Sequence, residues 1–390
     1  MSINILDKKQ CDGCAVCCNI CPKKCITMVE DDYGFLYPSI NRSDCIECGL
    51  CEKVCPITSC NTLKSEVRSV YAAWSKDSEI RYSSTSGGIF SELALQVLSK
   101  SGYVSAAAYD ENNIIHHVLI NDKNELENLR QSKYAQSRMD DIYEKIKIKL
   151  QDNTTVVLFC GTPCQVAGLK SFLQKTYSNL ITIDFICRGV NSPKALRKWI
   201  GEMEDIHNSK VRRIWFKYKI DGWKNSPKCT RIDFQNGNSI VKKEKDNSFM
   251  YGYLGPNLYI RPCCGSCKFK GKNRCADITL GDFWGINSHL DDDKGTSLVL
   301  INSIYGNVLF EDIKSRIEYS IRKLDEILDG NVCFNNSIKI NPKSEEFFKI
   351  LDLKKESFSK LVYRYSKKSI FEKSKNIMKG IINILQGRLK

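Results

Sequence analysis

Two groups of four cysteines near the start of the chain have the spacing that binds iron–sulfur clusters. In each group the pattern is C-x2-C-x2-C-x3-C followed by proline, and the second group repeats the first 34 residues later. The groups are Cys11, Cys14, Cys17 and Cys21 with Pro22, and Cys45, Cys48, Cys51 and Cys55 with Pro56. Thiolate sulfur is the soft ligand that these clusters require, and in this pattern the fourth cysteine of each run ligates the other cluster.

This rule sorts the eight cysteines into two sets of ligands. The first cluster set is Cys11, Cys14, Cys17 and Cys55, and the second cluster set is Cys45, Cys48, Cys51 and Cys21. The alternative is a pair of structural zinc sites, which usually take two CxxC pairs each. Two complete runs closed by Cys-Pro fit zinc poorly, so we predict two 4Fe-4S clusters. Three extra thiols, Cys18, Cys25 and Cys60, are interpreted as buried or incidental.

Four further cysteines are far apart in the sequence. Cys164 falls in the first turn of a predicted helix, where the helix dipole favours a thiolate, and Cys187 ends a predicted buried strand. Neighbouring parallel strands end at one edge of a sheet, where ligands gather. With the CxxC pair Cys264 and Cys267 they make a scattered quartet, which we predict to hold a third 4Fe-4S cluster. The alternative is a CxxC that binds nothing or forms a redox pair, with two core thiols. Cys263 and Cys275 are alternative ligands for this cluster, and Cys160 is interpreted as a packing residue.

A short hydroxyl- and glycine-rich segment directly precedes a predicted helix. It contains Ser84, Thr85, Ser86, Gly87 and Gly88. Free backbone N–H groups at the start of a helix bind anions, and glycines let a phosphate approach closely. The segment therefore suits a phosphate-bearing cofactor. The alternative is an ordinary Ser/Thr helix cap.

Hydrophobic periodicity gives the elements that would position these residues. A hairpin is predicted over 26–40 and a polar linker over 61–67. Strands are predicted at 69–75, 103–110, 114–120, 155–160, 180–187 and 297–303, with a strand-rich stretch over 211–240. Helices are predicted at 86–101, 162–175, 192–203 and near 308–317. Alternation of strands and helices after residue 69 indicates an α/β domain.

Composition and charge narrow the class of protein. The chain has 390 residues, 42% of them hydrophobic, and 20 cysteines, of which 11 lie between Cys11 and Cys60. No apolar run is long enough to span a membrane and no signal peptide is recognised, so we expect a cytoplasmic protein whose clustered cysteines bind metal. The net charge is +14, of which +9 belongs to residues 354–390. This basic tail is expected to be a solvated helix or a loose terminus. The alternative is a membrane-surface helix that makes weak contact with the inner face of the membrane. No nucleic-acid module is recognised.

Five motifs in order resemble those of the coenzyme F420 hydrogenase/dehydrogenase beta-subunit family. They are Thr85-Ser-Gly-Gly88, Gly161-Thr-Pro-Cys-Gln165, Cys187-Arg-Gly-Val190 with Ser192-Pro193, Arg261-Pro-Cys-Cys-Gly-Ser-Cys267 and Asp277-Ile-Thr-Leu-Gly-Asp-Phe-Trp-Gly285. The resemblance covers about residues 70–320, with the ferredoxin-type module in front. One departure is Arg188, which stands where the family usually has histidine.

The resemblance implies the fold class and the cofactors of the second part of the chain. We expect an α+β ferredoxin-like module followed by an α/β flavin-binding domain with a strand-rich cluster-bearing segment. Residues 84–88 would contact FAD, and Ser132-Lys133-Tyr134 would lie near the flavin with Lys133 as a charge partner. The scattered quartet matches cysteines of the family. The expected divisions are 1–60 for the ferredoxin domain, 69–150 and 151–320 for the two parts of the flavin domain, and 321–390 for the basic, partly helical tail.

These features predict a flavin-dependent iron–sulfur oxidoreductase. It would pass electrons between 4Fe-4S clusters, FAD and a small-molecule or deazaflavin-type redox partner. One alternative is an electron-relay subunit without its own substrate, and another is a non-redox protein with structural clusters. No catalytic acid or base is assigned, since none of the four histidines stands out. His116 and His117 are expected to be partly exposed structural residues.

Overall fold

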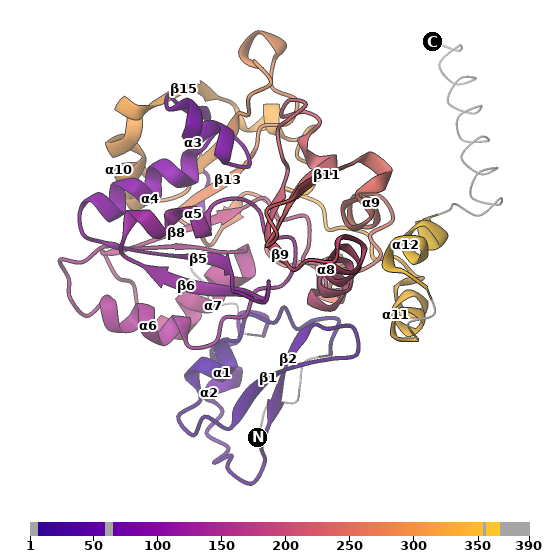
Figure 1. Ribbon diagram of the computed structural model, residues 1–390. Coiled ribbons are helices and arrows are strands. Elements are labelled where there is room, and N and C mark those ends of the chain that lie inside the picture. The colour runs from indigo at the N-terminus through magenta and orange to yellow at the C-terminus, as the bar shows by residue number, and fades with distance from the viewer. Residues whose placement is uncertain (1–6, 59–64, 354–355, 367–390) are drawn as a thin grey trace, which may run out of the picture.

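The computed structural model describes residues 7–58, 65–353 and 356–366, and it divides into a small N-terminal module and a larger body (Figure 1). The module contains two short helices and a hairpin. They are α1 (Val16–Ile20), β1 (Ile26–Glu30), β2 (Leu36–Ile40) and α2 (Leu50–Lys53). β1 and β2 are antiparallel, with Ile26 opposite Ile40, and Gly34 takes a φ of +79° in the connecting turn, where glycine is favoured. The predicted hairpin over 26–40 is thus confirmed.

An eight-stranded mixed sheet forms the centre of the body. Its strands are β4 (Ser69–Ser75), β5 (Tyr103–Tyr109), β6 (Ile115–Ile120), β7 (Val157–Cys160), β8 (Leu180–Phe185), β13 (Ile278–Asp282), β14 (Ser297–Ile301) and β15 (Ile317–Arg322). The strand order is β15-β4-β14-β13-β8-β7-β5-β6. The four central strands β5, β7, β8 and β13 are parallel, whereas the outer strands pair in antiparallel fashion. The α/β prediction is therefore confirmed in its coarse form, with a sheet that is mixed.

Helices cover both faces of this sheet. One face carries α4 (Ile89–Ser99), α5 (Leu126–Leu129) and α10 (Ile304–Ile313), and α3 (Ser78–Ser83) contacts β4; the other face carries α6 (Ile142–Lys149) and α7 (Pro163–Leu173). Side chains alternate between faces along a strand. Accordingly Leu158 of β7 packs with α4 and α10, whereas Val157 and Phe159 pack with α6 and α7.

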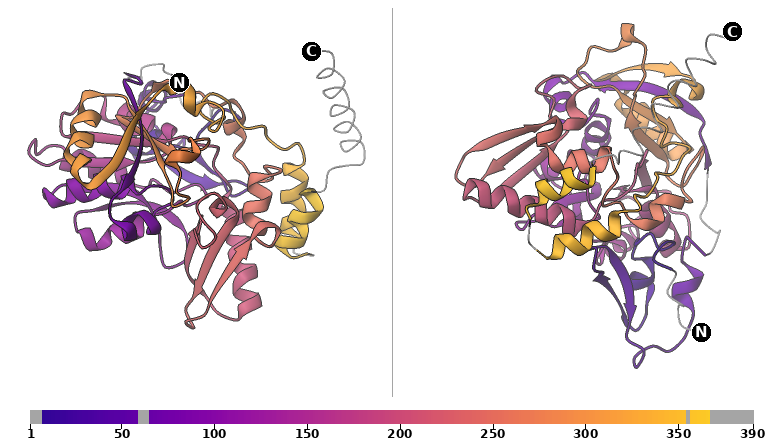
Figure 2. Two further views of the ribbon diagram at one scale, coloured as in Figure 1. Left: turned by 90° about the horizontal axis from the view of Figure 1, so that it is seen from above. Right: turned by 90° about the vertical axis from the view of Figure 1, so that its right-hand side faces the viewer.

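A second lobe lies beside the central sheet (Figure 2). It contains the antiparallel strands β9 (Val211–Phe216), β10 (Cys229–Phe234) and β11 (Ser239–Lys243), with α8 (Pro193–His207), α9 (Ser248–Leu254), α11 (Ser344–Asp352) and α12 (Phe358–Ser366). Trp199 is fully buried at its centre and stacks on Phe216 and Phe249. Large buried aromatics of this kind contribute most of the apolar burial of a lobe.

The remaining elements are short. They are β3 (Ser65–Glu66), β12 (Asn273–Arg274) and the 3-10 turns η1 (Lys123–Glu125), η2 (Ser226–Lys228), η3 (Glu244–Asp246), η4 (Pro262–Ser266), η5 (Ser288–Leu290), η6 (Lys314–Arg316) and η7 (Leu324–Ile327). β3 pairs with β12, so residues 65 and 66 of the predicted linker are a strand. Residues 61–64 of that linker, and Cys60, lie outside the described residues.

Two predictions near the C-terminus differ from the structure. The helix expected near 308–317 is α10, which begins at Ile304 because Ser303 caps it: the Ser303 hydroxyl accepts a hydrogen bond from the Gly306 N–H at 3.1 Å. Ile317 already belongs to β15. The segment expected as a tail contains α11 and α12, whose buried Phe347 and Leu361 belong to the core of the second lobe, so this part is not a solvated helix.

Residues 367–390 of the predicted basic tail lie outside the described residues. In the part of the chain that the structure describes, no helix has the length and apolar character of a membrane span.

Candidate iron–sulfur and flavin sites

The second cluster set surrounds a recess in the N-terminal module. Its four cysteines, together with Cys25, line a recess that is open to solvent. The Cys25 sulfur lies 3.4 Å from the sulfur of Cys21, so this extra thiol belongs to the same site. Cys48 is exposed, which places this set at the outer end of the module. Cys18 points elsewhere, because its sulfur lies 2.8 Å from the carbonyl oxygen of Ile26.

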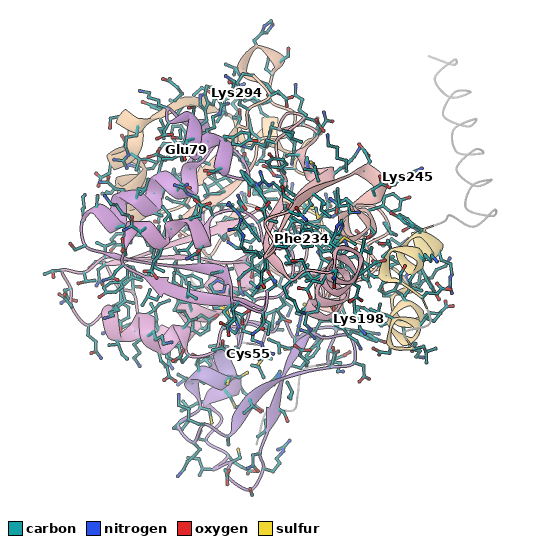
Figure 3. All side chains as sticks on the ribbon, viewed as in Figure 1. Cys55, Glu79, Lys198, Phe234, Lys245 and Lys294 are labelled. Carbon is teal, nitrogen blue, oxygen red and sulfur yellow. The ribbon has the colours of Figure 1, made fainter. Side chains whose placement is uncertain are left out.

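The first cluster set is gathered on the inner side of the module. Burial raises the pKa of Cys11, Cys14 and Cys17, and neighbouring members of the set raise each of these values further. Cys55 likewise raises the pKa of both Cys11 and Cys17, so this cysteine of the second run lies with three cysteines of the first run. Figure 3 shows Cys55 where the module meets the body. Like-charged thiolates this close need a cation between them, which fits a bound iron–sulfur cluster.

Helix α7 of the body supports this inner side. The Tyr143 hydroxyl lies 2.9 Å from the Cys14 carbonyl oxygen and 3.1 Å from that of Gln165 in α7. A side chain at Gly168 of α7 would meet the Cys14 Cβ at 3.1 Å, so glycine is required there for close approach. The Asn19 amide also donates to the Asp140 carbonyl at 2.8 Å. The first cluster set therefore lies directly against the helix that carries Cys164.

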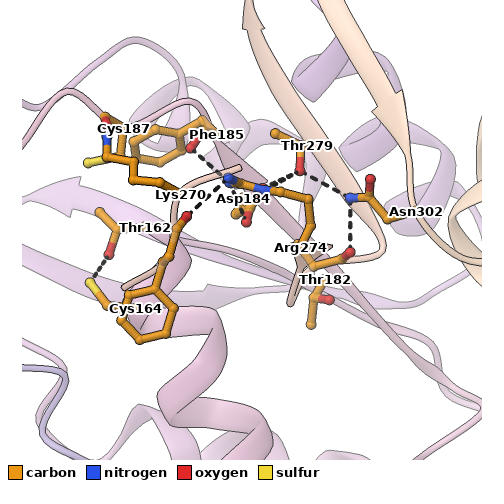
Figure 4. Close-up of polar contacts among 12 residues, drawn as sticks. Thr162, Cys164, Thr182, Asp184, Phe185, Cys187, Lys270, Arg274, Thr279 and Asn302 are labelled. Carbon is orange, nitrogen blue, oxygen red and sulfur yellow. Dashed lines mark hydrogen bonds and ion pairs between the residues drawn. The ribbon is translucent and has the colours of Figure 1, made fainter. Parts of the chain in front are cut away.

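The helix predicted over 162–175 is α7, and its start is capped. Thr162 is the N-cap, Pro163 occupies the first helical position, and the Gln165 side chain accepts the Thr162 N–H at 2.9 Å in a capping box. The Thr162 hydroxyl lies 3.0 Å from the Cys164 sulfur (Figure 4). Burial nevertheless raises the pKa of Cys164 well above its ordinary value, in opposition to the effect expected of the helix dipole. A metal-bound thiol would be deprotonated regardless.

The other members of the scattered quartet come from two chain segments that pair with each other. Cys187 follows β8, and Cys264 lies in η4 with Cys267 next to it. Arg261 donates its N–H to the Val190 carbonyl at 2.8 Å, and a Cβ at Gly189 would lie 3.4 Å from the Cys264 Cβ. This pairing carries the CxxC loop to the end of the parallel strand.

The four thiols of the scattered quartet are close enough to influence one another's ionisation. Burial raises the pKa of Cys187 to about 12, and the thiols of Cys264 and Cys267 contribute to the rise. The thiols of Cys187 and Cys267 likewise contribute to the raised pKa of Cys164. The pKa of Cys264 is instead lowered to about 7, chiefly because the Cys263 thiol donates a hydrogen bond to it. The fold thus brings together residues separated by up to 103 positions in the sequence.

Sequence reasoning missed the cation beside this quartet. The Lys270 ammonium donates to the carbonyls of Cys187 at 2.6 Å and Cys333 at 2.8 Å. Its charge lowers the pKa of the neighbouring quartet thiols, in opposition to burial. A lysine three residues after a CxxC pair was the available signal. Cys333 was not singled out either, and only tertiary structure brings it here.

Behind the quartet, a buried ion pair ties β8 to the CxxC segment (Figure 4). The Arg274 guanidinium donates to the Asp184 carboxylate at 2.8 Å and to the Phe269 carbonyl at 3.2 Å, and both charged side chains are almost fully buried. Thr279 donates to Asp184 at 2.5 Å. A buried pair with all its hydrogen bonds satisfied holds its surroundings in one arrangement. Arg274 therefore orients the loop that ends at Cys267.

Single-ion sites and cluster sites differ in geometry. Among the described residues, no three Cys, His, Asp or Glu side chains converge as ligands of one metal ion would. A cubane cluster binds each cysteine at a separate iron, so its ligands need not converge on a point. The donor sets described above, four thiols each, suit such clusters.

The hydroxyls of the predicted phosphate segment have partners within the protein. Ser84 lies 3.3 Å from the Ser91 hydroxyl, Thr85 lies 3.2 Å from that of Ser132, and Ser86 donates to the Thr296 carbonyl at 2.8 Å. The contact between Thr85 and Ser132 brings the two segments predicted to flank the flavin side by side. This adjacency is a property of the fold that the sequence pattern did not contain.

The glycines of the segment make room for protein. A Cβ at Gly87 would meet the Ala73 carbonyl oxygen at 2.5 Å, and Gly88 takes a φ of +91° as the N-cap of α4. The Gly87 N–H donates to the Ser297 hydroxyl at 2.9 Å. Packing against β4 and β14 therefore already explains the two glycines, whereas the start of α4 remains the anion-binding feature.

Two basic side chains lie next to this segment. The Lys133 ammonium donates to the carbonyls of Asn128 and Arg130, and burial lowers the pKa of Lys133 to about 7. Arg130 donates to the Ser83 hydroxyl at 3.2 Å, and its buried Nε has no hydrogen-bond partner among the described residues. An unsatisfied buried guanidinium N–H beside a helix start suits a phosphate oxygen. Arg130 was not predicted from the sequence.

Other residues singled out from the sequence have structural surroundings. His117 is buried between the Cys160 carbonyl at 3.1 Å and the Ser137 hydroxyl at 3.0 Å, and burial lowers its pKa to about 4, so the expected partial exposure is wrong. His116 faces Asp110 and Asp140. Arg188 donates hydrogen bonds to the Leu254 carbonyl and to the Asn257 side-chain oxygen. Cys160 and Cys275 pack in the core.

Comparison with known proteins identifies the class of this chain. Residues 10–59 match a 4Fe-4S dicluster domain, residues 70–143 match the N-terminal part of the coenzyme F420 hydrogenase/dehydrogenase beta subunit, and residues 154–327 match its C-terminal part. A search among curated proteins found no match. One similar solved structure is a chain of the F420-reducing [NiFe] hydrogenase complex from Methanosarcina barkeri, with 17% identity, a TM-score of 0.45, and coverage of 77% of this chain and 92% of that chain.

The fold and sites define an iron–sulfur oxidoreductase component, built from a two-cluster ferredoxin domain and a mixed α/β body. In particular, the chain belongs to the coenzyme F420 hydrogenase/dehydrogenase beta-subunit family, with a 4Fe-4S dicluster domain at its N-terminal side.

Proposed function

We propose that the protein is an iron–sulfur flavoprotein that passes electrons between three 4Fe-4S clusters, FAD and a small-molecule or deazaflavin-type redox partner. The observation that carries this proposal is the meeting of the scattered quartet beside the first cluster set, with α7 in contact with both. These four half-buried thiols influence one another's ionisation, and a metal cluster between them would stabilise their thiolates.

The arrangement of the three cysteine sets suits a relay. The second cluster set faces solvent through Cys48, the first cluster set lies against α7, and the scattered quartet lies at the ends of the parallel strands. Electron transfer between clusters depends on close spacing and on the local environment of each centre. The chain's contribution is to fix that spacing through Tyr143 and Gly168 and to exclude water from the inner sets.

For the flavin, the proposal uses the segment at residues 84–88 and the neighbouring cations. The start of α4 and Arg130 would hold the pyrophosphate, and Lys133 would supply charge near the isoalloxazine. When bound, FAD exchanges electron pairs as hydride with a small molecule and single electrons with clusters. Lys133, whose buried ammonium has a pKa near 7, would hold or release a proton close to neutral pH.

The alternative function is an electron-relay subunit of a larger redox complex without a substrate of its own. The exposed second cluster set favours contact with a protein partner, because Cys48 and Ile46 lie open at the surface beside it. Turnover of a soluble hydride donor by the isolated chain would support the first function, whereas activity only with a protein partner would support the second.

Anaerobic purification with iron, sulfide and flavin measured per chain tests the cofactor content. About twelve irons and one FAD are expected, since each cubane holds four irons. Cys164→Ala should remove about four irons and leave the ferredoxin domain loaded. Cys160→Ala is the matched control, because Cys160 ends β7 just before the same connection but is outside the quartet. Eight irons in the unmodified protein would contradict the third cluster.

A further inference from the structure

A single arginine lies at the junction between the two cluster-bearing parts of the molecule. Arg261 is only 1% exposed, although its chain segment is a surface loop of the body. Its guanidinium donates to the Cys11 carbonyl at 3.0 Å, the Leu36 carbonyl at 3.0 Å and the Gln136 side-chain oxygen at 3.0 Å. These contacts join the body to both the cysteine loop and the hairpin of the N-terminal module.

The arginine has no carboxylate as an ion-pair partner. Within the described residues, none of the ion pairs found within 4.0 Å involves Arg261, and its hydrogen-bond acceptors are neutral oxygens. The Asp12 carboxylate also attracts the Arg261 charge, but it forms no ion pair with it within 4.0 Å. Burying a guanidinium without a counter-charge is strongly unfavourable, so a negative group should be close to it.

The Cys11 sulfur is a candidate for that negative charge. It lies 3.9 Å from an Nη atom of Arg261. The rings of Tyr37 and Phe35, 4.1 and 5.5 Å from the guanidinium carbon, shield the contact from water. Gly13, with a φ of +71°, provides the space, since a Cβ there would come within 3.0 Å of the guanidinium.

The same residue is tied to the scattered quartet through its backbone. The Arg261 carbonyl accepts the Cys264 N–H at 3.0 Å, and the Arg261 N–H is bonded to Val190, three residues after Cys187. Arg261 thus places its charged side chain beside the first cluster set and its backbone beside the scattered quartet. A lysine would carry the charge but could not form the same planar set of hydrogen bonds.

We propose that Arg261 is the charge partner of the cluster held by the first cluster set and positions that cluster against the scattered quartet. A four-thiolate cluster is anionic and becomes more so on reduction, so a fixed guanidinium beside it stabilises the reduced form. The inference rests on the ferredoxin domain holding clusters, and on neither the flavin nor the third cluster.

The test compares Arg261→Gln with Arg261→Lys in the full chain, purified anaerobically. The reduction potential of each cluster is measured by a redox titration that is monitored by electron paramagnetic resonance. We expect Arg261→Gln to keep its ferredoxin iron but to shift one cluster to lower potential. The expected shift is about tenfold or more in the reduction equilibrium, which is about 59 mV for one electron. Arg261→Lys should restore most of the potential because it retains the charge.

Arg81→Gln is the matched control, since Arg81 is also a buried guanidinium but pairs with Asp292 far from Cys11 in the sequence and fold. It should leave every cluster potential unchanged. Unaltered potentials in iron-loaded Arg261→Gln would overturn the proposal while leaving the ferredoxin domain intact.

A measurement on the unmodified sequence covers the case in which Arg261→Gln does not fold. Protein labelled with ¹⁵N in its arginine side chains should show a ¹⁵N hyperfine coupling to a reduced cluster, because Arg261 Nη lies 3.9 Å from a ligand sulfur. Absence of such a coupling in protein with reduced ferredoxin clusters contradicts the proposal. Loss of all clusters would instead count against the proposed function, so the two failures are distinguishable.

Discussion

The two halves of the N-terminal module carry the same cysteine motif in different surroundings. The first cluster set packs against α7, where Cys14 is 6% exposed and Tyr143 contacts its carbonyl, whereas the second cluster set lines an open recess that includes exposed Cys48. A repeated motif specifies similar ligands, but solvent exposure and nearby charges tune each cluster. The comparison shows that the two halves, although alike in sequence motif, differ in what each of them touches.

Removing one cysteine from each half gives the largest expected effects. Cys14→Ala and Cys48→Ala should each lose about four irons per chain, since each cubane holds four. Only Cys14→Ala should also lower the melting temperature of the body, by about 2–4 °C for each kcal/mol of stability lost in a domain of this size. Iron analysis and thermal unfolding under anaerobic conditions measure both. Equal melting temperatures would show that the halves do not differ in coupling to the body.

The Tyr143 hydroxyl offers a finer test of the inner half. Tyr143→Phe leaves the buried carbonyls of Cys14 and Gln165 without this donor, which should cost about 1–3 kcal/mol of unfolding free energy. The matched control is Tyr305→Phe on α10, whose ring is 37% exposed, and which should be nearly neutral. Denaturant unfolding followed by tyrosine and tryptophan fluorescence measures the difference. A neutral Tyr143→Phe would argue that α7 does not hold the first half.

The smallest expected effect concerns the hairpin side of the module. Glu30 of β1 forms ion pairs with Arg197 of α8, at 2.6 Å, and with Arg138, at 3.3 Å. These side chains are partly exposed, so Glu30→Gln should cost only about 0.2–1 kcal/mol. The loss should shrink further at about 1 M salt, where the Debye length is near 3 Å. A salt-independent loss would indicate a packing role for Glu30.

Elements with a strong local signal were predictable. The hairpin over 26–40, β4 and the capped start of α7 appear where the sequence predicted them, because turn glycine, alternation and the Thr162–Gln165 box act over a few residues. The start of α10 was missed because Ser303 caps the helix four residues before the apolar pattern was recognised. The burial of α11 and α12 was missed because the basic character of the tail suggested a solvated segment, whereas Phe347 and Leu361 pack in the core of the second lobe.

The cation contacts of the cysteine sets were beyond prediction. Arg261 is 250 residues from Cys11, and Lys270 contacts carbonyls on two separate segments. Neither contact follows from spacing along the chain, since each depends on which loops the sheet brings together. The same is true of Thr85 and Ser132, whose adjacency joins the two segments predicted near the flavin.

The sequence by itself determined the ligand chemistry of the N-terminal module, because three cysteines on one tight loop and a fourth before proline are a local pattern that needs little further folding to bind a cluster. Only the tertiary structure decided which half faces solvent, that four distant thiols meet beside α7, and that a buried guanidinium stands at Cys11. The physical reason is that burial and electrostatic neighbours are set by long-range packing, which residue spacing does not contain.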